Sequence, residues 1–271
     1  MERKKRLIVL SIILASVLLI VVLSSALFRF KSASIECRTN TFVITTADHQ
    51  AIIDSAEFKF GSNILFTNFN KNIENIEQKN PYVKVINIER KFPNYAVVNI
   101  RERVPAVRLA CAGGGYYCVD SELKVLNVVT DSTQYNKSLN EDKLPELIID
   151  NSANINYDRK LTSGQFIENS KLQEIVSAFY NGAVTGQNIG GEVVANSCIS
   201  TISTIKVSYE EVLKCLRFDV DFGMSSSKAI IYYSNALTDN IYKIMTLFIQ
   251  HGEEYSVYKC SPSGEITAEA Y

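Results

Sequence analysis

The sequence has few residues suited to catalysis or metal binding. His49 and His251 are its only two histidines, and they lie far apart in the chain. The histidines and cysteines also lack the close pairwise spacing of a zinc site. The glycine run 113–115 has neither the lysine nor the following helix of a phosphate-binding loop. The sequence therefore predicts a non-enzymatic protein that needs no metal or cofactor.

Strong charge of either sign is also absent. The formal net charge is -1 over 271 residues. Residues 1–6 carry four basic residues and one acid, or +3, which leaves -1 minus 3, or -4, for the rest. This balance lacks the basic bias of nucleic-acid binders, so no nucleic-acid partner is expected. Hydrophobic residues make up 46% and charged residues 21%, which is typical of a folded chain.

A long apolar run near the N-terminus indicates a membrane anchor. Leu7 to Phe28 comprises 22 uncharged residues, which would span about 33 Å as a helix and cross a bilayer core of about 30 Å. The basic residues at 3–6 place the N-terminus in the cytoplasm and residues 29–271 outside, as in a single-pass type II protein of the plasma membrane. The alternative is a signal peptide cleaved near Ser24 and Ala26. We favour the anchor, because signal-peptide cores usually run about 7–15 residues.

Six cysteines in a segment expected outside the cytoplasm permit three disulfides. Cys111 and Cys118 flank the glycine run and could face each other across a hairpin, so they form the candidate disulfide. The alternative is that most of the cysteines are small buried apolar residues.

Residues 35–105 predict a small α+β domain of order β-α-α-β-β, which follows a short linker at 29–34. Thr46 and Gly61 bound the first helix, and Asn80-Pro81 closes the second. The expected strands are Ile35–Val43, Val83–Arg90 and Tyr95–Val104.

Residues 106–271 predict a mainly antiparallel β domain with two packing helices. Apolar residues recur at i, i+3, i+4 and i+7 from Leu172 to Phe179 and from Ile241 to Phe248, the second helix being capped by Thr238. The chain is expected to end in a hairpin of strands Tyr255–Cys260 and Glu265–Tyr271. The strands expected before it are Val107–Cys111, Tyr116–Asp120, Lys124–Val129, Ser203–Val207, Leu216–Phe222 and Lys228–Tyr233.

Four motifs resemble the POTRA domain of the FtsQ/DivIB family of bacterial cell division proteins in order and spacing. They are Gly61–Leu65, Asn80–Val83, Ile88–Pro93 and Ile100–Pro105. Tyr116–Asp120, Val125-Leu126 and Leu144-Pro145 resemble the start of the family's β domain, although the usual glycine is replaced around Ser121-Glu122-Leu123.

This resemblance implies a scaffold at the division septum. Its partners would be FtsL-like and FtsB/DivIC-like membrane proteins and, through them, the septal peptidoglycan synthase complex. The family binds these partners by adding a strand at the end of the β domain. The candidate partner-binding residues here are Tyr255, Tyr258, Ile266, Thr267, Ala268 and Glu269.

Arg101 and Arg103 form the candidate recruitment surface, the alternative being an ordinary solvated strand face. Three other classes of protein stay open. One is a POTRA-bearing component of outer-membrane assembly, and another is an extracytoplasmic cell-wall enzyme. The third is a membrane-anchored sensor or sporulation scaffold with a POTRA-like fold.

Overall fold

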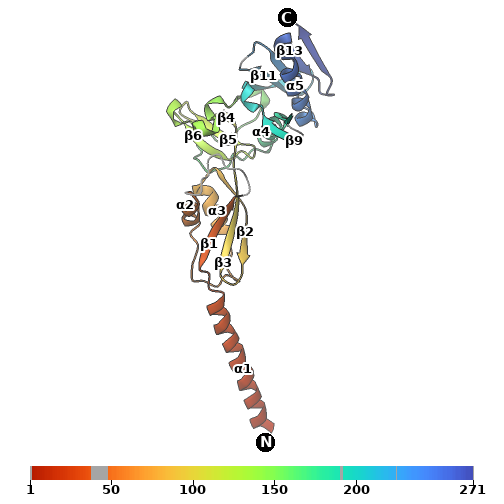
Figure 1. Cartoon of the computed structure of the whole chain (residues 1–271). Helices are drawn as coiled ribbons and strands as arrows, with labels where there is room; N and C mark the ends of the chain where they lie inside the picture. The colour runs from red at the N-terminus through yellow and green to blue at the C-terminus, as the bar shows by residue number, and fades with distance from the viewer. Residues whose placement is uncertain (1, 38–47, 190–191, 224, 271) are drawn as a thin grey trace. The chain divides into compact units, whose positions relative to one another are not determined.

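The computed structural model describes residues 2–37, 48–189, 192–223 and 225–270 (Figure 1). These residues divide into two compact units, and the division falls after Glu102. The domain boundary expected after Pro105 lies three residues further along the chain.

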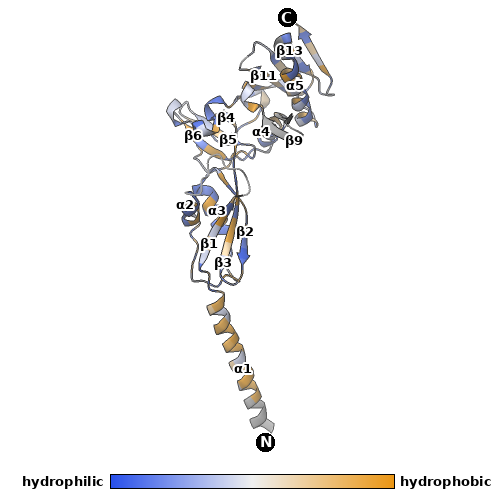
Figure 2. Ribbon diagram, in the orientation of Figure 1, coloured by the Kyte–Doolittle hydropathy of each residue, from blue (hydrophilic) through white to orange (hydrophobic). Residues whose placement is uncertain are grey.

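The first unit begins with helix α1, Glu2–Leu27. Its stretch Val9–Leu27 is long and apolar enough to cross a membrane, and none of it is buried against the rest of the protein. Figure 2 shows most of α1 as hydrophobic. The Ser16 and Ser25 hydroxyls donate to the carbonyls of Ile12 and Val21 within the helix, at 2.8 and 2.7 Å. Internal bonding of this kind suits a helix in a medium without water.

The rest of the first unit is a three-stranded sheet with two helices on one face. Its sheet order is β1-β3-β2, with β1 parallel and β2 antiparallel to β3. The element order is the predicted β-α-α-β-β. The elements are β1 Ser32–Cys37, α2 Asp48–Ser55, α3 Asn70–Lys79, β2 Val83–Lys91 and β3 Tyr95–Glu102.

Alternation along β3 explains why the helices lie on one face of this sheet. Val98 and Ile100 point into a cluster with Ile52 of α2 and Ile76 of α3, and all four are buried. The Asn72 side-chain amide also donates to the Ala56 carbonyl at 2.8 Å, which fixes α3 against the end of α2.

Two boundaries in this unit differ from the prediction. The first helix ends at Ser55 rather than near Gly61, because Glu57 adopts a φ of 55°, which no right-handed helix accommodates. β1 begins at Ser32, inside the predicted linker. The Thr46 cap and residues 38–43 of the predicted strand lie outside the described residues.

The second unit is built on one long mixed sheet. Its strand order is β14-β13-β12-β11-β10-β7-β4-β5-β6. β7 runs parallel to both of its neighbours and β12 runs parallel to β13, whereas the other pairs are antiparallel. A separate antiparallel ribbon consists of β8 and β9. The α+β fold class is therefore confirmed, with a more mixed sheet than predicted.

The bounds of the remaining elements are as follows. The strands are β4 Pro105–Ala110, β5 Tyr116–Asp120, β6 Val125–Val129, β7 Glu146–Ile149, β8 Val184–Ile189, β9 Glu192–Ser197, β10 Ile202–Glu210, β11 Cys215–Phe222, β12 Lys228–Tyr232, β13 Tyr255–Cys260 and β14 Ile266–Ala270. The helices are α4 Ser170–Gly182 and α5 Leu237–His251, with short 3-10 turns between several elements, three of them in the polar segment 132–143.

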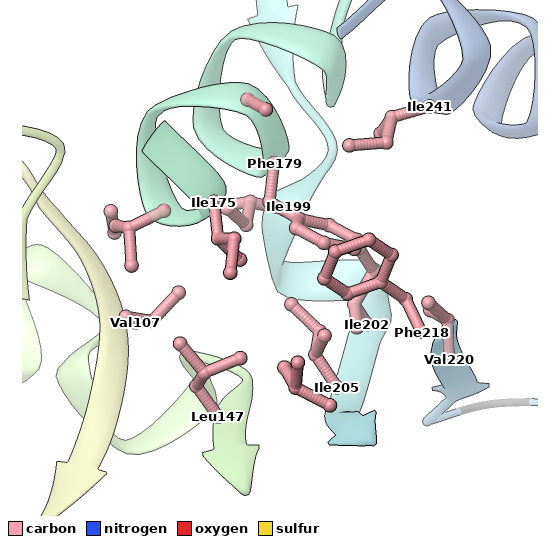
Figure 3. Packing of buried hydrophobic residues seen from close by; sticks show 14 of the residues in the cluster. Val107, Leu147, Ile175, Phe179, Ile199, Ile202, Ile205, Phe218, Val220 and Ile241 are labelled. Atoms are coloured by element: carbon pink, nitrogen blue, oxygen red, sulfur yellow. The ribbon is translucent and has the colours of Figure 1, made fainter. Parts of the chain in front are cut away.

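Helices α4 and α5 pack on this sheet through the predicted stripes. Leu172, Ile175, Val176 and Phe179 of α4 are all buried. In Figure 3 the ring of Phe179 meets that of Phe218 from β11, with their centroids 5.5 Å apart. Both packing helices are thereby confirmed.

Several local features of the second unit were not predicted. The short strand β7 lies between β4 and β10, and its four residues gave no usable alternation. The ribbon of β8 and β9 was also missed. Helix α5 begins at Leu237 with Ala236 at its N-cap and no side-chain cap bond, so the predicted Thr238 cap is wrong.

Candidate functional site

The C-terminal strand β14 lies at one end of the long sheet. It pairs with β13 alone in the strand order, and β13 pairs on its other side with β12. Its residues after Ile266 are exposed along their whole described length. An edge strand of this kind presents unpaired backbone groups that a further strand can use.

A tight turn fixes the register of β14 against β13. The Ser261 N–H donates to the Glu265 carbonyl, and the Gly264 N–H donates to the Ser261 carbonyl, each at 2.9 Å. Gly264 adopts a φ of 83°, the left-handed conformation that glycine accepts without strain. The turn therefore sets Lys259 opposite Thr267 and Tyr258 opposite Ala268.

This register decides which backbone groups face outward. Opposite pairs in an antiparallel ladder alternate between bonded and non-bonded. Since Ser261 and Glu265 are bonded, the next bonded pair is Lys259 with Thr267. The N–H and C=O groups of Ile266 and Ala268 are then directed away from β13, toward the open edge.

The predicted partner-binding side chains divide into an exposed and a buried group. Thr267, Ala268 and Glu269 are exposed, and Ile266 is half-buried against the core. Tyr258 is 0% exposed, and its hydroxyl donates to the Gly252 carbonyl at 3.1 Å. Tyr258 thus supports the strand from behind, so its expected contact with a partner is corrected to a core position.

The neighbouring strand holds β14 in place through side chains. Lys259 Nζ lies 2.5 Å from Glu269 Oε1, and the Ser256 hydroxyl donates to the Glu269 carbonyl at 3.0 Å. Tyr255 is half-buried, and its ring packs edge-on against Tyr258 with centroids 5.7 Å apart. The sequence could not reveal these supports, because they depend on the strand register.

The two candidate recruitment arginines have different environments. Arg101 is exposed on β3 of the first unit, opposite Lys84. Arg103 belongs to the second unit and is only 5% exposed. Its guanidinium contacts Asp120 at 2.6 Å and Glu122 at 2.9 Å. Arg103 is therefore corrected to a structural residue, and a role in recruitment stays a prediction for Arg101.

Cys111 and Cys118 are both free thiols in the structure. Cys118 lies opposite Arg108 in the β4–β5 ladder, three positions from Cys111. Cys111 belongs to the main core, whereas Cys118 packs with Val129 and Leu144 in a separate cluster. The two side chains therefore enter different clusters, and the structure contradicts the expected hairpin disulfide.

Both histidines lie among the described residues. Within the described residues, no group of three histidine, cysteine or acidic side chains is arranged to hold a metal ion. His251, the last residue of α5, contacts Glu254 of the following 3-10 turn at 3.2 Å, and both side chains are exposed.

These features define a class of protein: a chain with one apolar N-terminal helix, a small β-α-α-β-β domain, and a β domain that ends in an open sheet edge. Residues 43–103 match the family model of the POTRA domain, FtsQ-type. The chain therefore carries an FtsQ-type POTRA domain, which confirms the predicted resemblance to the FtsQ/DivIB family over this region. This domain suggests a family of cell division proteins. No curated protein matches the chain.

Proposed function

We propose that this protein is a non-enzymatic scaffold of the bacterial division complex. It recruits and stabilises FtsL-like and FtsB/DivIC-like single-span partners at the septum, and through them controls the septal peptidoglycan synthase. The N-terminal helix anchors it in the plasma membrane with the N-terminus in the cytoplasm.

The observation that carries this proposal is the open β14 edge in a chain with an FtsQ-type POTRA domain. Backbone groups of Ile266 and Ala268 offer hydrogen bonds to an added strand. The exposed side chains of Thr267, Ala268 and Glu269 give that strand its specificity. The charged Glu269 and the short length of β14 discourage indiscriminate pairing with other edges.

The register also selects the best position for a test. A proline at Thr267 would break a bond between β13 and β14, and so would disturb the hairpin itself. A proline at Ala268 removes only an N–H that faces outward, which edge strands tolerate. Ala268→Ser keeps that N–H and is the matched control.

The experiment measures binding of the full-length chain in detergent to the FtsL-like and DivIC-like proteins of the same organism. Ala268→Pro should weaken binding about tenfold or more, equivalent to about 1.4 kcal/mol. Ala268→Ser should bind as the unaltered protein does. If an Ala268→Pro variant with a normal melting temperature bound the partners as before, the β14 edge would not be the partner-binding site. The absence of any binding by the unaltered folded chain would favour a membrane-anchored sensor or sporulation scaffold.

A further inference from the structure

Exposed apolar side chains of the first unit gather beside the point where the chain leaves α1. Between residues 28 and 102, the described large hydrophobic side chains that are exposed are Phe60, Leu65, Phe66, Ile86, Phe92 and Tyr95. All except Ile86 lie in segments 58–73 and 90–95. Phe66 is 85% exposed, an unusual position for a phenylalanine in a folded domain.

Backbone hydrogen bonds tie both segments to the residues that directly follow α1. The Ile64 N–H donates to the Phe28 carbonyl at 2.9 Å, and the Phe30 N–H donates to the Ser62 carbonyl at 2.8 Å. The Lys31 N–H donates to the Asn94 carbonyl at 2.8 Å. Because Leu27 is the last residue of α1, both segments are held within a few residues of the end of the apolar span.

Leu65 and Phe66 belong to an ordered turn within segment 58–73. The Asn63 side-chain oxygen accepts the Leu65 N–H at 3.0 Å, and the Asn63 carbonyl accepts the Phe66 N–H at 3.2 Å. Ile64, which lies between Asn63 and Leu65, is 0% exposed and anchors the turn in the core. The turn therefore presents Leu65 and Phe66 outward while the core stays filled.

Basic residues outnumber acidic ones around these side chains, although Glu57, Glu74 and Glu89 directly border the two segments and Glu89 lies 2.7 Å from Lys91. Segments 28–34, 58–73 and 90–95 contain Arg29, Lys31, Lys59, Lys71, Arg90 and Lys91, and no aspartate or glutamate. All six basic residues are exposed. We call these three segments the juxtamembrane face. Apolar tips among lysines and arginines are the combination that binds the interface of an anionic bilayer.

We propose that the juxtamembrane face rests on the outer surface of the same membrane that α1 crosses. Leu65 and Phe66 enter the boundary between headgroups and acyl chains, and Lys59 and Lys71 contact anionic headgroups. The inference depends on the membrane anchoring included in the proposed function. Its consequence is that the POTRA domain is held at a fixed height above the bilayer, rather than swinging on a flexible tether.

Continuity with the apolar span favours a lipid surface over a protein partner for this face. A partner would have to reach residues that are hydrogen-bonded to the first residues after α1, where headgroups lie if α1 crosses the membrane as proposed. The excess of basic residues, six in the three segments against three bordering acids, fits an anionic surface.

The sequence contains no tryptophan, so a single introduced tryptophan reports on one position. The reporter is Phe66→Trp in the full-length chain, reconstituted in nanodiscs of phosphatidylcholine with phosphatidylglycerol. The measurements are its emission maximum and its quenching by lipids with brominated acyl chains. Val212→Trp is the matched control, because Val212 is also 85% exposed but lies in the second unit. Leu18→Trp reports on α1 itself.

The expected result is a blue-shifted, quenched emission for Phe66→Trp and an unshifted, unquenched emission for Val212→Trp. If Leu18→Trp is quenched and Phe66→Trp is not, α1 lies in the membrane. The proposal that the juxtamembrane face contacts lipid is then overturned. The face would be open to a protein partner. If Leu18→Trp is not quenched either, the membrane anchoring fails and this inference fails with it.

A second comparison tests the charge. Lys59→Glu and Lys71→Glu are introduced together into the Phe66→Trp chain. Quenching should fall in discs that contain phosphatidylglycerol and should change little in discs of phosphatidylcholine alone. Equal quenching with and without the charge reversals in anionic discs would overturn the contact between these lysines and headgroups.

Discussion

Arg103 and Asp120 form a buried ion pair at the start of the β domain. Their nearest nitrogen and oxygen are 2.6 Å apart, and the two side chains are 4% and 7% exposed. The other Asp120 oxygen accepts the backbone N–H groups of Glu122 and Lys124, at 2.9 and 2.8 Å. One carboxylate therefore organises the turn after β5, in which the family's usual glycine is replaced.

Loss of the Arg103 charge should destabilise this domain strongly. Arg103→Met leaves the Asp120 carboxylate buried without its cation, which typically costs about 3–5 kcal/mol. Arg101→Met is the control, since Arg101 is exposed and such changes usually stay within about 0.5 kcal/mol. Urea unfolding of the full-length chain in detergent, followed by circular dichroism, measures both. Equal losses for the two variants would contradict the structural role of Arg103.

Gly182 allows α4 and α5 to approach closely. A β-carbon at this position would lie 2.7 Å from Cβ of Ile241, closer than real atoms pack. Gly182→Ala should therefore destabilise by about 1–3 kcal/mol through overpacking, although alanine is the better helix former. Ile241→Gly in the same chain removes both Ile241 atoms that this β-carbon would meet, Cβ and Cγ2, and should relieve much of the clash, although the Thr238 carbonyl oxygen at 2.8 Å stays. A double-mutant cycle by urea unfolding should thus give less destabilisation than the sum of the single changes. Additive losses would show that the helices do not meet at this glycine.

Removal of the Tyr258 hydroxyl should affect stability but not partner binding. Tyr258→Phe loses the bond to the Gly252 carbonyl and should cost about 0.5–1.5 kcal/mol. Because the side chain is buried behind β14, affinity for the FtsL-like and DivIC-like proteins should stay unchanged. Thermal unfolding and binding are measured on the same preparation. Lost binding with unchanged stability would return Tyr258 to the interface.

The cysteines should differ sharply in their reaction with iodoacetamide. Burial raises the pKa of the Cys118 thiol far above its usual range, with a smaller contribution from the Glu141 charge. At pH 8 this thiol stays protonated, and the thiolate is the reactive form. Cys37 and Cys198 are partly exposed, so they should be alkylated in the native chain, whereas Cys118 should react only after unfolding.

Mass spectrometry of native and urea-unfolded samples, without a reductant, measures this difference. If Cys111 and Cys118 both resist alkylation in urea until a reductant is added, and their peptides are linked in the unreduced digest, the two are bonded to each other in the protein. That outcome would restore the disulfide indicated by their spacing and would contradict the strand register described above.

Local patterns in the sequence were enough to predict several elements. The uncharged run after the basic N-terminus indicated α1, because only a helix satisfies its own backbone in an apolar medium. Periodic apolar residues predicted α4 and most of α5, and alternation predicted β3. The order β-α-α-β-β followed from these signals together with Pro81 and its neighbours.

The arrangement of strands was beyond the reach of local patterns. β7 is short, and its place between β4 and β10 depends on pairings with residues about 40 and 60 positions away. The placement of β14 at the sheet edge likewise depends on the parallel pairing of β13 with β12. The sequence of a single strand does not determine which other strand it pairs with.

The sequence by itself determined the class of this protein: an apolar N-terminal helix, a POTRA domain and a β domain that ends in a hairpin. Only the tertiary structure decided which residues of that hairpin face outward. It also decided that Arg103 is buried and that Cys111 and Cys118 enter different clusters. The physical reason is that side-chain direction in a sheet alternates with each residue, so register and long-range packing fix burial.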